Sequence, residues 1–185
     1  RMITVVSGLP RSGTSLLMQM LEAGGLPLQF DGARRADVHN LRGYYEDRRV
    51  MSLAADHSWL AEADGMGLKV VSLLLYDLPS HLEYRVIFMR RDMEEILRSQ
   101  DKMLADTAPE QVGADIRRHF EKHLEELAKW LPQQDHIQWM ELEFRSVIEA
   151  PLEAAGRVAE FLQQELDLEA MAAVIEPSLY RQRVE

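Results

Sequence analysis

Cysteine is absent from the 185 residues of the sequence. Its absence excludes disulfide bonds, thiolate nucleophiles and cysteine-based zinc sites, and it favours a cytoplasmic location. Positive charge is also scarce, because 21 Lys and Arg residues face 31 Asp and Glu residues, for a formal net charge of -10. This balance argues against nonspecific binding of nucleic acid, which needs a surplus of basic side chains to displace counterions from phosphates.

Long hydrophobic runs are missing as well. No apolar run reaches the length needed to cross a membrane, so no membrane association is expected. The apolar run at residues 2–6 is short and leads directly into a glycine-containing motif, which indicates a strand rather than a signal peptide. Hydrophobic residues nevertheless make up 46% of the sequence, enough for a sizeable core. We expect residues 1–185 to form a single domain.

Strand-like and helix-like segments alternate along the chain. Apolar, β-rich runs predict strands, whereas apolar residues at helical spacing predict helices. Residues 26–45 show no clear periodicity and are expected to form a loop. Strands are predicted at 2–7, 68–75, 84–89 and 136–142, and helices from 13 to about 21, 47–60, 92–104, 112–131 and 151–162. The alternation predicts a three-layer α/β/α fold of the P-loop type, with a mostly parallel central sheet.

A glycine-containing loop joins the first predicted strand to the first predicted helix, over residues 8–15. Backbone N–H groups and the helix dipole converge on an anion at such a junction. Gly8 and Gly13 keep the spacing of a Walker A loop, but Thr14 stands where that motif has its lysine. Arg11 is then the only charge expected to replace the lysine. The alternative is a turn of glycine and hydroxyl residues that merely links two elements.

A magnesium site is not indicated beside this loop. The strand at 84–89 runs into Arg90 and Arg91, whereas a nucleotide-bound magnesium ion needs a carboxylate there. We therefore expect a metal-free site that binds an anion with arginines. For Arg91 the competing interpretation is a local ion pair with Asp92 or Glu95.

Three segments resemble the sulfotransferase family. "GLPRSGTSLL" is similar to the family's phosphosulfate-binding loop, and "ELEFRSVIEAPLEAAGRVAEFL" is similar to its C-terminal strand, turn and helix. In "YRVIFMRRDMEEILRS", Arg91 and Ser99 have the eight-residue spacing of the family's 3′-phosphate ligands. The resemblance covers most of the chain from residue 2 to residue 162.

The resemblance implies that the protein transfers a sulfuryl group from 3′-phosphoadenosine 5′-phosphosulfate (PAPS) to a hydroxyl or amine of a small acceptor. Arg11 would be the catalytic cation in this reaction. A basic tail, "EPSLYRQR", is similar to that of bacterial members, so Arg181 and Arg183 would close over the nucleotide. The residues implied to bind PAPS are Arg11, Ser12, Gly13, Thr14, Ser15, Arg91, Ser99, Arg181 and Arg183.

The general base is less clearly marked. Many family members have a histidine two residues after a strand lysine, but Lys69 is followed by Val70 and Val71. Glu46 in "NLRGYYEDRR" is the first candidate for the base, and His39 is the second. Glu46 could equally well bind free N–H groups at a helix start. Two alternatives stay open: a nucleotide-binding module of the same fold without activity, and a P-loop kinase or NTPase.

Overall fold

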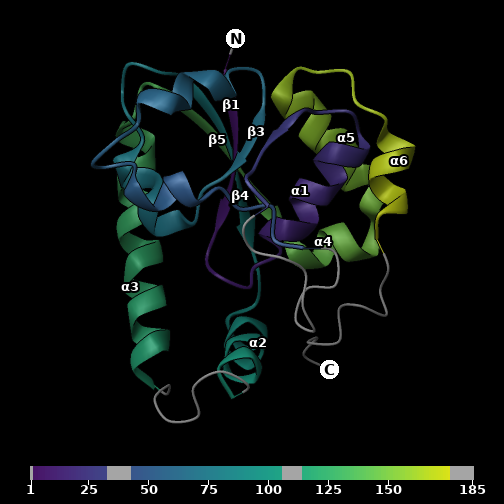
Figure 1. The fold of residues 1–185 in the computed structure, drawn as a ribbon. Helices are drawn as coiled ribbons and strands as arrows, with labels where there is room; N and C mark the ends of the chain where they lie inside the picture. The colour runs from purple at the N-terminus through teal and green to yellow at the C-terminus, as the bar shows by residue number, and fades with distance from the viewer. Residues whose placement is uncertain (1, 33–42, 106–113, 176–185) are drawn as a thin grey trace.

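The computed structural model describes residues 2–32, 43–105 and 114–175. Its centre is a five-stranded sheet in the order β2-β3-β1-β4-β5, and every pair of neighbouring strands is parallel. The strands are β1 (Ile3–Gly8), β2 (Leu28–Gln29), β3 (Gly67–Lys69), β4 (Tyr84–Arg90) and β5 (Ile137–Glu143). The predicted α/β fold with a parallel sheet is therefore confirmed (Figure 1).

The central strand β1 is buried along its whole length, as its continuous apolar run predicts. It pairs with β3 on one side and with β4 on the other, in a register that joins Val5 to Leu68 and to Val86. The chain builds β2 and β3 on one side of β1 and then crosses to β4. This change of direction makes the carboxyl end of β1 a topological switch point, where open α/β sheets bind ligands.

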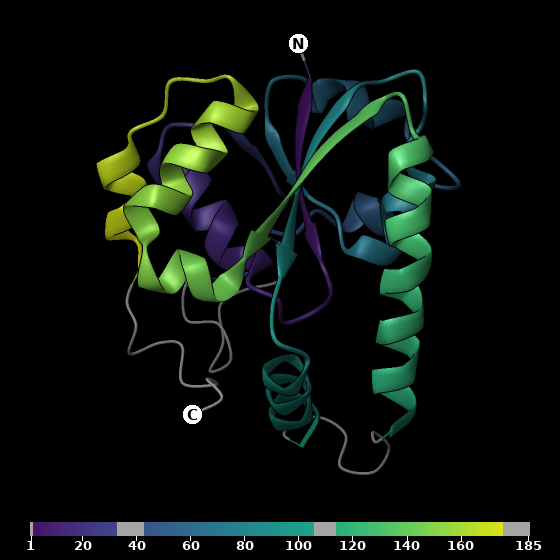
Figure 2. The ribbon, with the colours of Figure 1, turned by 180° about the vertical axis from the view of Figure 1, so that it is seen from behind.

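Helices cover one face of the sheet (Figures 1 and 2). They are α1 (Thr14–Ala23), α4 (Phe144–Glu149), α5 (Pro151–Leu162) and α6 (Leu168–Ala173). One apolar cluster joins them to the sheet and includes Leu17 and Leu21 of α1, Ile87 of β4 and Val158 of α5. The predicted helix at 151–162 is confirmed at both ends, whereas the short α4 and α6 were not predicted.

The opposite face carries α3 (Ala114–Trp130) and three 3-10 helices: η1 (Arg48–Ser52), η2 (Ser58–Ala63) and η3 (Ser72–Asp77). A second apolar cluster holds them, with Leu53, Leu60, Leu75 and Leu127 packed against the sheet. A fourth 3-10 helix, η4 (Leu131–Gln133), follows α3. The apolar stripe predicted for α3 thus faces the core where the helix lies over the sheet.

Three predicted segments differ from the structure. Residues 28–29, within the predicted loop at 26–45, form strand β2. Residues 47–60 form η1 and η2 instead of one helix, and the Asp56 side chain accepts a hydrogen bond from the backbone N–H of Ser58, which starts a new turn between them. The predicted strand 68–75 ends at Lys69, and its remainder turns into η3. Short apolar runs fit a buried turn as well as a strand, so periodicity alone does not separate them.

Helix α2 (Met93–Ala105) follows β4 and lies beyond the carboxyl edge of the sheet, beside the N-terminal half of α3 (Figures 1 and 2). Its predicted cap is confirmed, because Oδ1 of Asp92 accepts a hydrogen bond from the N–H of Glu95. None of the helices in the described ranges is both long enough and apolar enough to cross a membrane.

Candidate functional site

The loop after β1, the β4–α2 connection and the end of β3 meet at the carboxyl edge of the sheet. β3 and β4 are the two neighbours of β1, so the residues that follow these three strands come together at the switch point. Arg11 comes from the first of these segments, Arg91 from the second and Lys69 from the third. The cations predicted in the loop and after β4 are therefore neighbours.

The loop at residues 8–13 has a backbone that its glycines make possible. Gly13 precedes α1 with φ of 98°, and a Cβ there would lie 2.5 Å from Cδ2 of Phe144. Arg11 also has a left-handed backbone, with φ of 64°, although it is not a glycine. Such a conformation costs about 1–3 kcal/mol and occurs mainly at functional sites.

The start of α1 is suited to an anion. Gly13 is its N-cap and provides no side-chain hydrogen bond, and the first turn contains no acidic residue. The N–H groups of the first turn therefore lack a capping side chain, and the helix dipole adds positive potential. Thr14 and Ser15 open this turn, as predicted.

Ser12 has a different part in the loop. Its side chain is fully buried, and its hydroxyl donates a 2.6 Å hydrogen bond to the carbonyl of Leu9. The hydroxyl therefore shapes the loop, and any contact of Ser12 with a ligand would be made by its backbone N–H.

Arg11, Arg91 and Ser99 are joined by two hydrogen bonds. Nε of Arg11 donates to Oγ of Ser99 at 2.8 Å, and Nη1 of Arg91 donates to the carbonyl of Arg11 at 3.0 Å. The loop after β1 is thus tied both to the end of β4 and to the second turn of α2. Arg11, Arg91 and Ser99 come from a loop, a strand end and a helix. The fold brings them together in one cluster.

Arg91 is also paired within the protein. Its Nε donates to Oε2 of Glu95 at 3.1 Å, and its guanidinium carbon lies 4.2 Å from the ring centroid of Phe144. The side chains of Arg91 and Glu95 are only 8% and 3% exposed. Burial lowers the pKa of Arg91, and the carboxylate of Glu95 opposes that effect. The ion pair considered as the alternative for Arg91 is therefore present, together with its contact to the loop.

Lys69 is a cation that the sequence did not assign to the site. Its Nζ donates hydrogen bonds of 2.8 Å to Oγ of Ser15 and of 2.8 Å to the carbonyl of Tyr44. The expectation that Arg11 alone replaces the Walker lysine is therefore wrong, since the last residue of β3 brings an ammonium group to the same loop. The parallel pairing of β1 with β3 places it there.

Glu46, the candidate base, lies beside Lys69. Its Oε1 is 3.7 Å from Nζ of Lys69, and its side chain is 39% exposed. The N-cap of the adjacent helix η1 is Asp47, whose side chain accepts from the N–H of Arg49. His39, Arg181 and Arg183 lie outside the described residues.

Candidate metal ligands do not gather at this site. Over residues 2–32, 43–105 and 114–175, no three side chains of His, Asp or Glu form a group that could hold a metal ion. The N–H, guanidinium, ammonium and hydroxyl groups that converge at the loop are donors that fit an anion. The carboxylates of Glu46 and Glu95 lie beside two of these cations, Lys69 and Arg91.

Comparison with known proteins supports the fold class. The sulfotransferase from Alicyclobacillus acidocaldarius matches with a TM-score of 0.53 and 13% sequence identity, over 97% of this chain and 88% of that chain. At this identity the match shows a shared fold. The chain therefore has the α/β fold found in a sulfotransferase.

Two further solved structures are similar over nearly the whole chain. The sulfotransferase domain from the curacin biosynthetic pathway matches with a TM-score of 0.47 and 13% identity, over 100% of this chain and 78% of that domain. A sugar kinase from Janibacter sp. HTCC2649 matches with a TM-score of 0.46 and 16% identity, over 94% of this chain and 97% of the kinase. No family model matches the sequence, and no curated protein matches it either.

Proposed function

We propose that the protein is a sulfotransferase that uses PAPS and transfers the sulfuryl group to a hydroxyl or amine of a small acceptor. In this proposal the backbone N–H groups of Ser12 and Gly13, with Thr14 and Ser15, bind the 5′-phosphosulfate. Arg91 and Ser99 belong to the part of the site that binds the 3′-phosphate. Arg181 and Arg183, from the C-terminal segment, would close over the nucleotide.

The observation that carries the proposal is the contact of Arg11 with both Ser99 and Arg91. A loop at a helix N-terminus binds a single phosphate group readily, so it does not by itself distinguish among nucleotides. In the proposal, Arg91 and Ser99, which are joined to the loop through Arg11, form a second anion-binding position beside the first. A nucleotide with phosphates on both its 5′ and 3′ oxygens fits such a pair of positions.

The chemistry requires cations where negative charge develops. In sulfuryl transfer the acceptor atom bonds to sulfur, the bond from sulfur to the bridging phosphate oxygen breaks, and the acceptor proton leaves. Arg11 is part of the loop and Nζ of Lys69 contacts Ser15, and fixed cations at a developing anion lower the barrier. Glu46 would take the proton, since its carboxylate lies on the same side of the loop as Lys69.

Binding of 3′-phosphoadenosine 5′-phosphate (PAP) tests the nucleotide part of the proposal. Calorimetry in the presence of EDTA should give micromolar or tighter affinity for PAP and weaker affinity for ADP, which lacks the 3′-phosphate. Equal affinity for PAP and ADP, or binding of either only with magnesium, would contradict the proposal and favour a kinase or NTPase.

Transfer from labelled PAPS tests the enzymatic part. The protein is incubated with phenols, alcohols and amines, and labelled product is measured with and without each acceptor. Turnover with any acceptor supports the sulfotransferase. Tight binding of PAP without turnover on a broad panel would favour the nucleotide-binding module without activity.

A further inference from the structure

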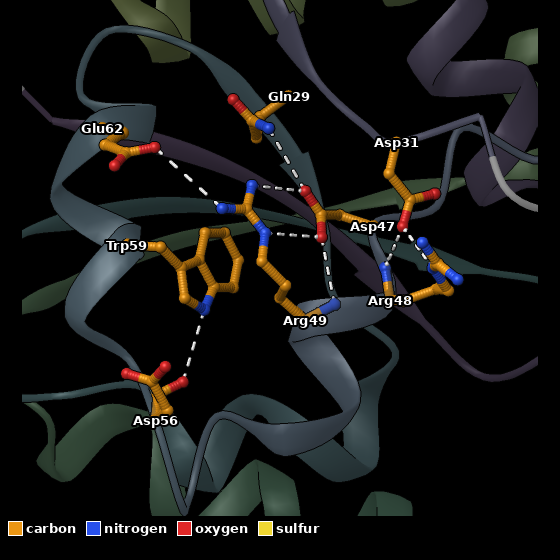
Figure 3. Close-up of polar contacts among 8 residues, drawn as sticks. All are labelled: Gln29, Asp31, Asp47, Arg48, Arg49, Asp56, Trp59 and Glu62. Carbon is orange, nitrogen blue, oxygen red and sulfur yellow. Dashed lines mark hydrogen bonds and ion pairs between the residues drawn. The ribbon is translucent and has the colours of Figure 1, made fainter.

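A buried carboxylate lies next to Glu46 in the sequence and has its hydrogen-bond partners outside the phosphate loop. The side chain of Asp47 is fully buried. It accepts hydrogen bonds from Nε and Nη2 of Arg49 at 3.1 and 2.8 Å, from the N–H of Arg49 at 3.0 Å and from Nε2 of Gln29 at 3.2 Å (Figure 3). Both of its oxygens are therefore used, and the hydrogen bonds from Arg49 lower the pKa of Asp47.

The arginine of this pair is itself held in place. The guanidinium carbon of Arg49 lies 4.2 Å from the ring centroid of Trp59, and Nη1 is 4.0 Å from Oε2 of Glu62. Trp59 is buried and donates from Nε1 to the carbonyl of Asp56 at 3.3 Å. Asp47 is thus connected through Arg49 to η2, and through Gln29 to β2.

Asp31 also holds the residues on both sides of Asp47, through contacts with Glu46 and Arg48. Its N–H donates to the carbonyl of Glu46 at 3.1 Å, and its Oδ2 accepts from both N–H and Nε of Arg48, at 2.9 and 3.1 Å. The residues on either side of Asp47 are therefore held to the extension of β2. This leaves the backbone at Glu46 little freedom.

The segment so held is the one that faces Lys69. The carbonyl of Tyr44 accepts from Lys69, and the carboxylate of Glu46 is its ion-pair partner. Tyr45, between them, has a left-handed φ of 55°, which an unconstrained tyrosine avoids. Because the local backbone conformation is unfavourable, contacts outside the segment must maintain it.

We propose that Asp47 is a positioning residue: through Arg49 and Gln29 it fixes the Tyr44–Glu46 backbone, and so holds Lys69 and Glu46 in place at the phosphate loop. Its relevance to sulfuryl transfer rests on the proposed function. The positioning of Lys69 is a separate property that can be measured without any ligand.

Lysine signals in NMR spectra give that measurement. The sequence contains four lysines, and Lys102, Lys122 and Lys129 are exposed. In protein labelled with ¹³C-lysine, the Lys69 signal is assigned by its loss in Lys69→Arg. Asp47→Asn should move that signal toward those of the exposed lysines, because Asn cannot pair with the charge of Arg49 and the Tyr44 carbonyl then shifts away from Nζ.

The matched control is Asp167→Asn. Asp167 also caps a helix, with Oδ1 accepting from the N–H of Ala170 at 2.9 Å, but it belongs to α6 and is exposed. This control should leave the Lys69 signal where it is. Circular dichroism establishes that each variant is folded at the temperature used, and Arg49→Lys replaces Asp47→Asn if the latter does not fold.

Activity provides the second readout. Asp47→Asn should lower kcat for PAPS-dependent transfer by about tenfold to a hundredfold and change PAP affinity far less, because the substituted residue lies outside the loop proposed to bind PAP while Lys69 and Glu46 are displaced. A Lys69 signal that stays in place in both Asp47→Asn and Arg49→Lys would overturn the inference. Failure of the wild type to bind PAP would instead overturn the proposed function, and the Lys69 signal would still decide the role of Asp47.

Discussion

Arg11 and Ser99 are 88 positions apart in the sequence, yet Nε of Arg11 donates a 2.8 Å hydrogen bond to the hydroxyl of Ser99. The contact joins the loop after the central strand to the helix after β4. It explains how two short motifs, each weak evidence alone, become one site. The nearby contact of Arg91 with the Arg11 carbonyl strengthens the same connection.

Replacement of Arg11 by glycine should lower the affinity for PAP and leave the stability of the protein nearly unchanged. Arg11→Gly removes the guanidinium and also the strain of a left-handed backbone at a non-glycine residue. The loss of strain stabilises the folded state, and this offsets the entropy that glycine adds to the unfolded chain. We expect PAP affinity to fall about tenfold or more, which corresponds to about 1.4 kcal/mol, while the melting temperature changes little.

Calorimetry and thermal unfolding measure these two quantities. Arg118→Ala, at an exposed position of α3, is the control and should leave both unchanged. Unaltered PAP affinity in Arg11→Gly would show that Arg11 does not face the nucleotide.

Because Arg91 and Glu95 form a buried ion pair, substitutions at these two positions should have non-additive effects on the free energy of unfolding. Arg91→Met leaves the buried carboxylate of Glu95 without its partner Arg91. Nη2 of Arg145 is 3.8 Å from this carboxylate, but the Arg145 side chain is largely exposed. We expect the free energy of unfolding to fall by about 3 kcal/mol, since an unpaired buried charge is costly. Adding Glu95→Gln should recover part of the loss.

Urea denaturation of the two single variants and the double variant forms a complete cycle. Equal losses in Arg91→Met and in Arg91→Met/Glu95→Gln would contradict a buried ion pair. PAP affinity of the double variant then reports whether Arg91 is needed for the 3′-phosphate apart from its structural role.

Asp47 predicts a pH dependence of stability with a definite sign. Its pKa in the folded protein is lowered from the ordinary value of 3.8, chiefly by hydrogen bonds from Arg49. A carboxyl with a lowered pKa contributes stability above its unfolded-state pKa, and this contribution is lost as the pH falls toward the folded-state value. The difference in unfolding free energy between wild type and Asp47→Asn should therefore be constant above about pH 5 and shrink below pH 3.8.

Urea midpoints measured from pH 6 to pH 3 test this directly. Asp167→Asn, at an exposed cap, serves as the comparison for an Asp to Asn change. A difference that grows as the pH falls would have the wrong sign for an ionised Asp47.

Local sequence signals predicted β1 and β4 closely, because buried parallel strands are continuous apolar runs bounded by turn residues. They also predicted β5, although this edge strand is mostly exposed. The glycine-containing loop between β1 and α1 was predicted as well, and its Gly13 has a left-handed backbone. Residues 70–75 were predicted incorrectly, because a short apolar run packs equally well as a turn of 3-10 helix. The pairing of residues far apart in the sequence, such as Lys69 with Ser15, depends on the strand order and could not be read from periodicity.

Lys69 makes the sharpest prediction about catalysis. Its ammonium group contacts Ser15 at the start of α1, whereas Ser99 accepts from Arg11 and Arg91 pairs with Glu95. If it stabilises charge that develops only in the transition state, Lys69→Met should lower kcat about 10²–10³-fold and change PAP affinity far less. Lys69→Arg, which keeps the charge, should retain more activity. The control is Lys129→Met, at an exposed position of α3, and it should behave as wild type. A loss of PAP affinity with kcat unchanged would instead mean that Lys69 binds the ground state and the transition state equally.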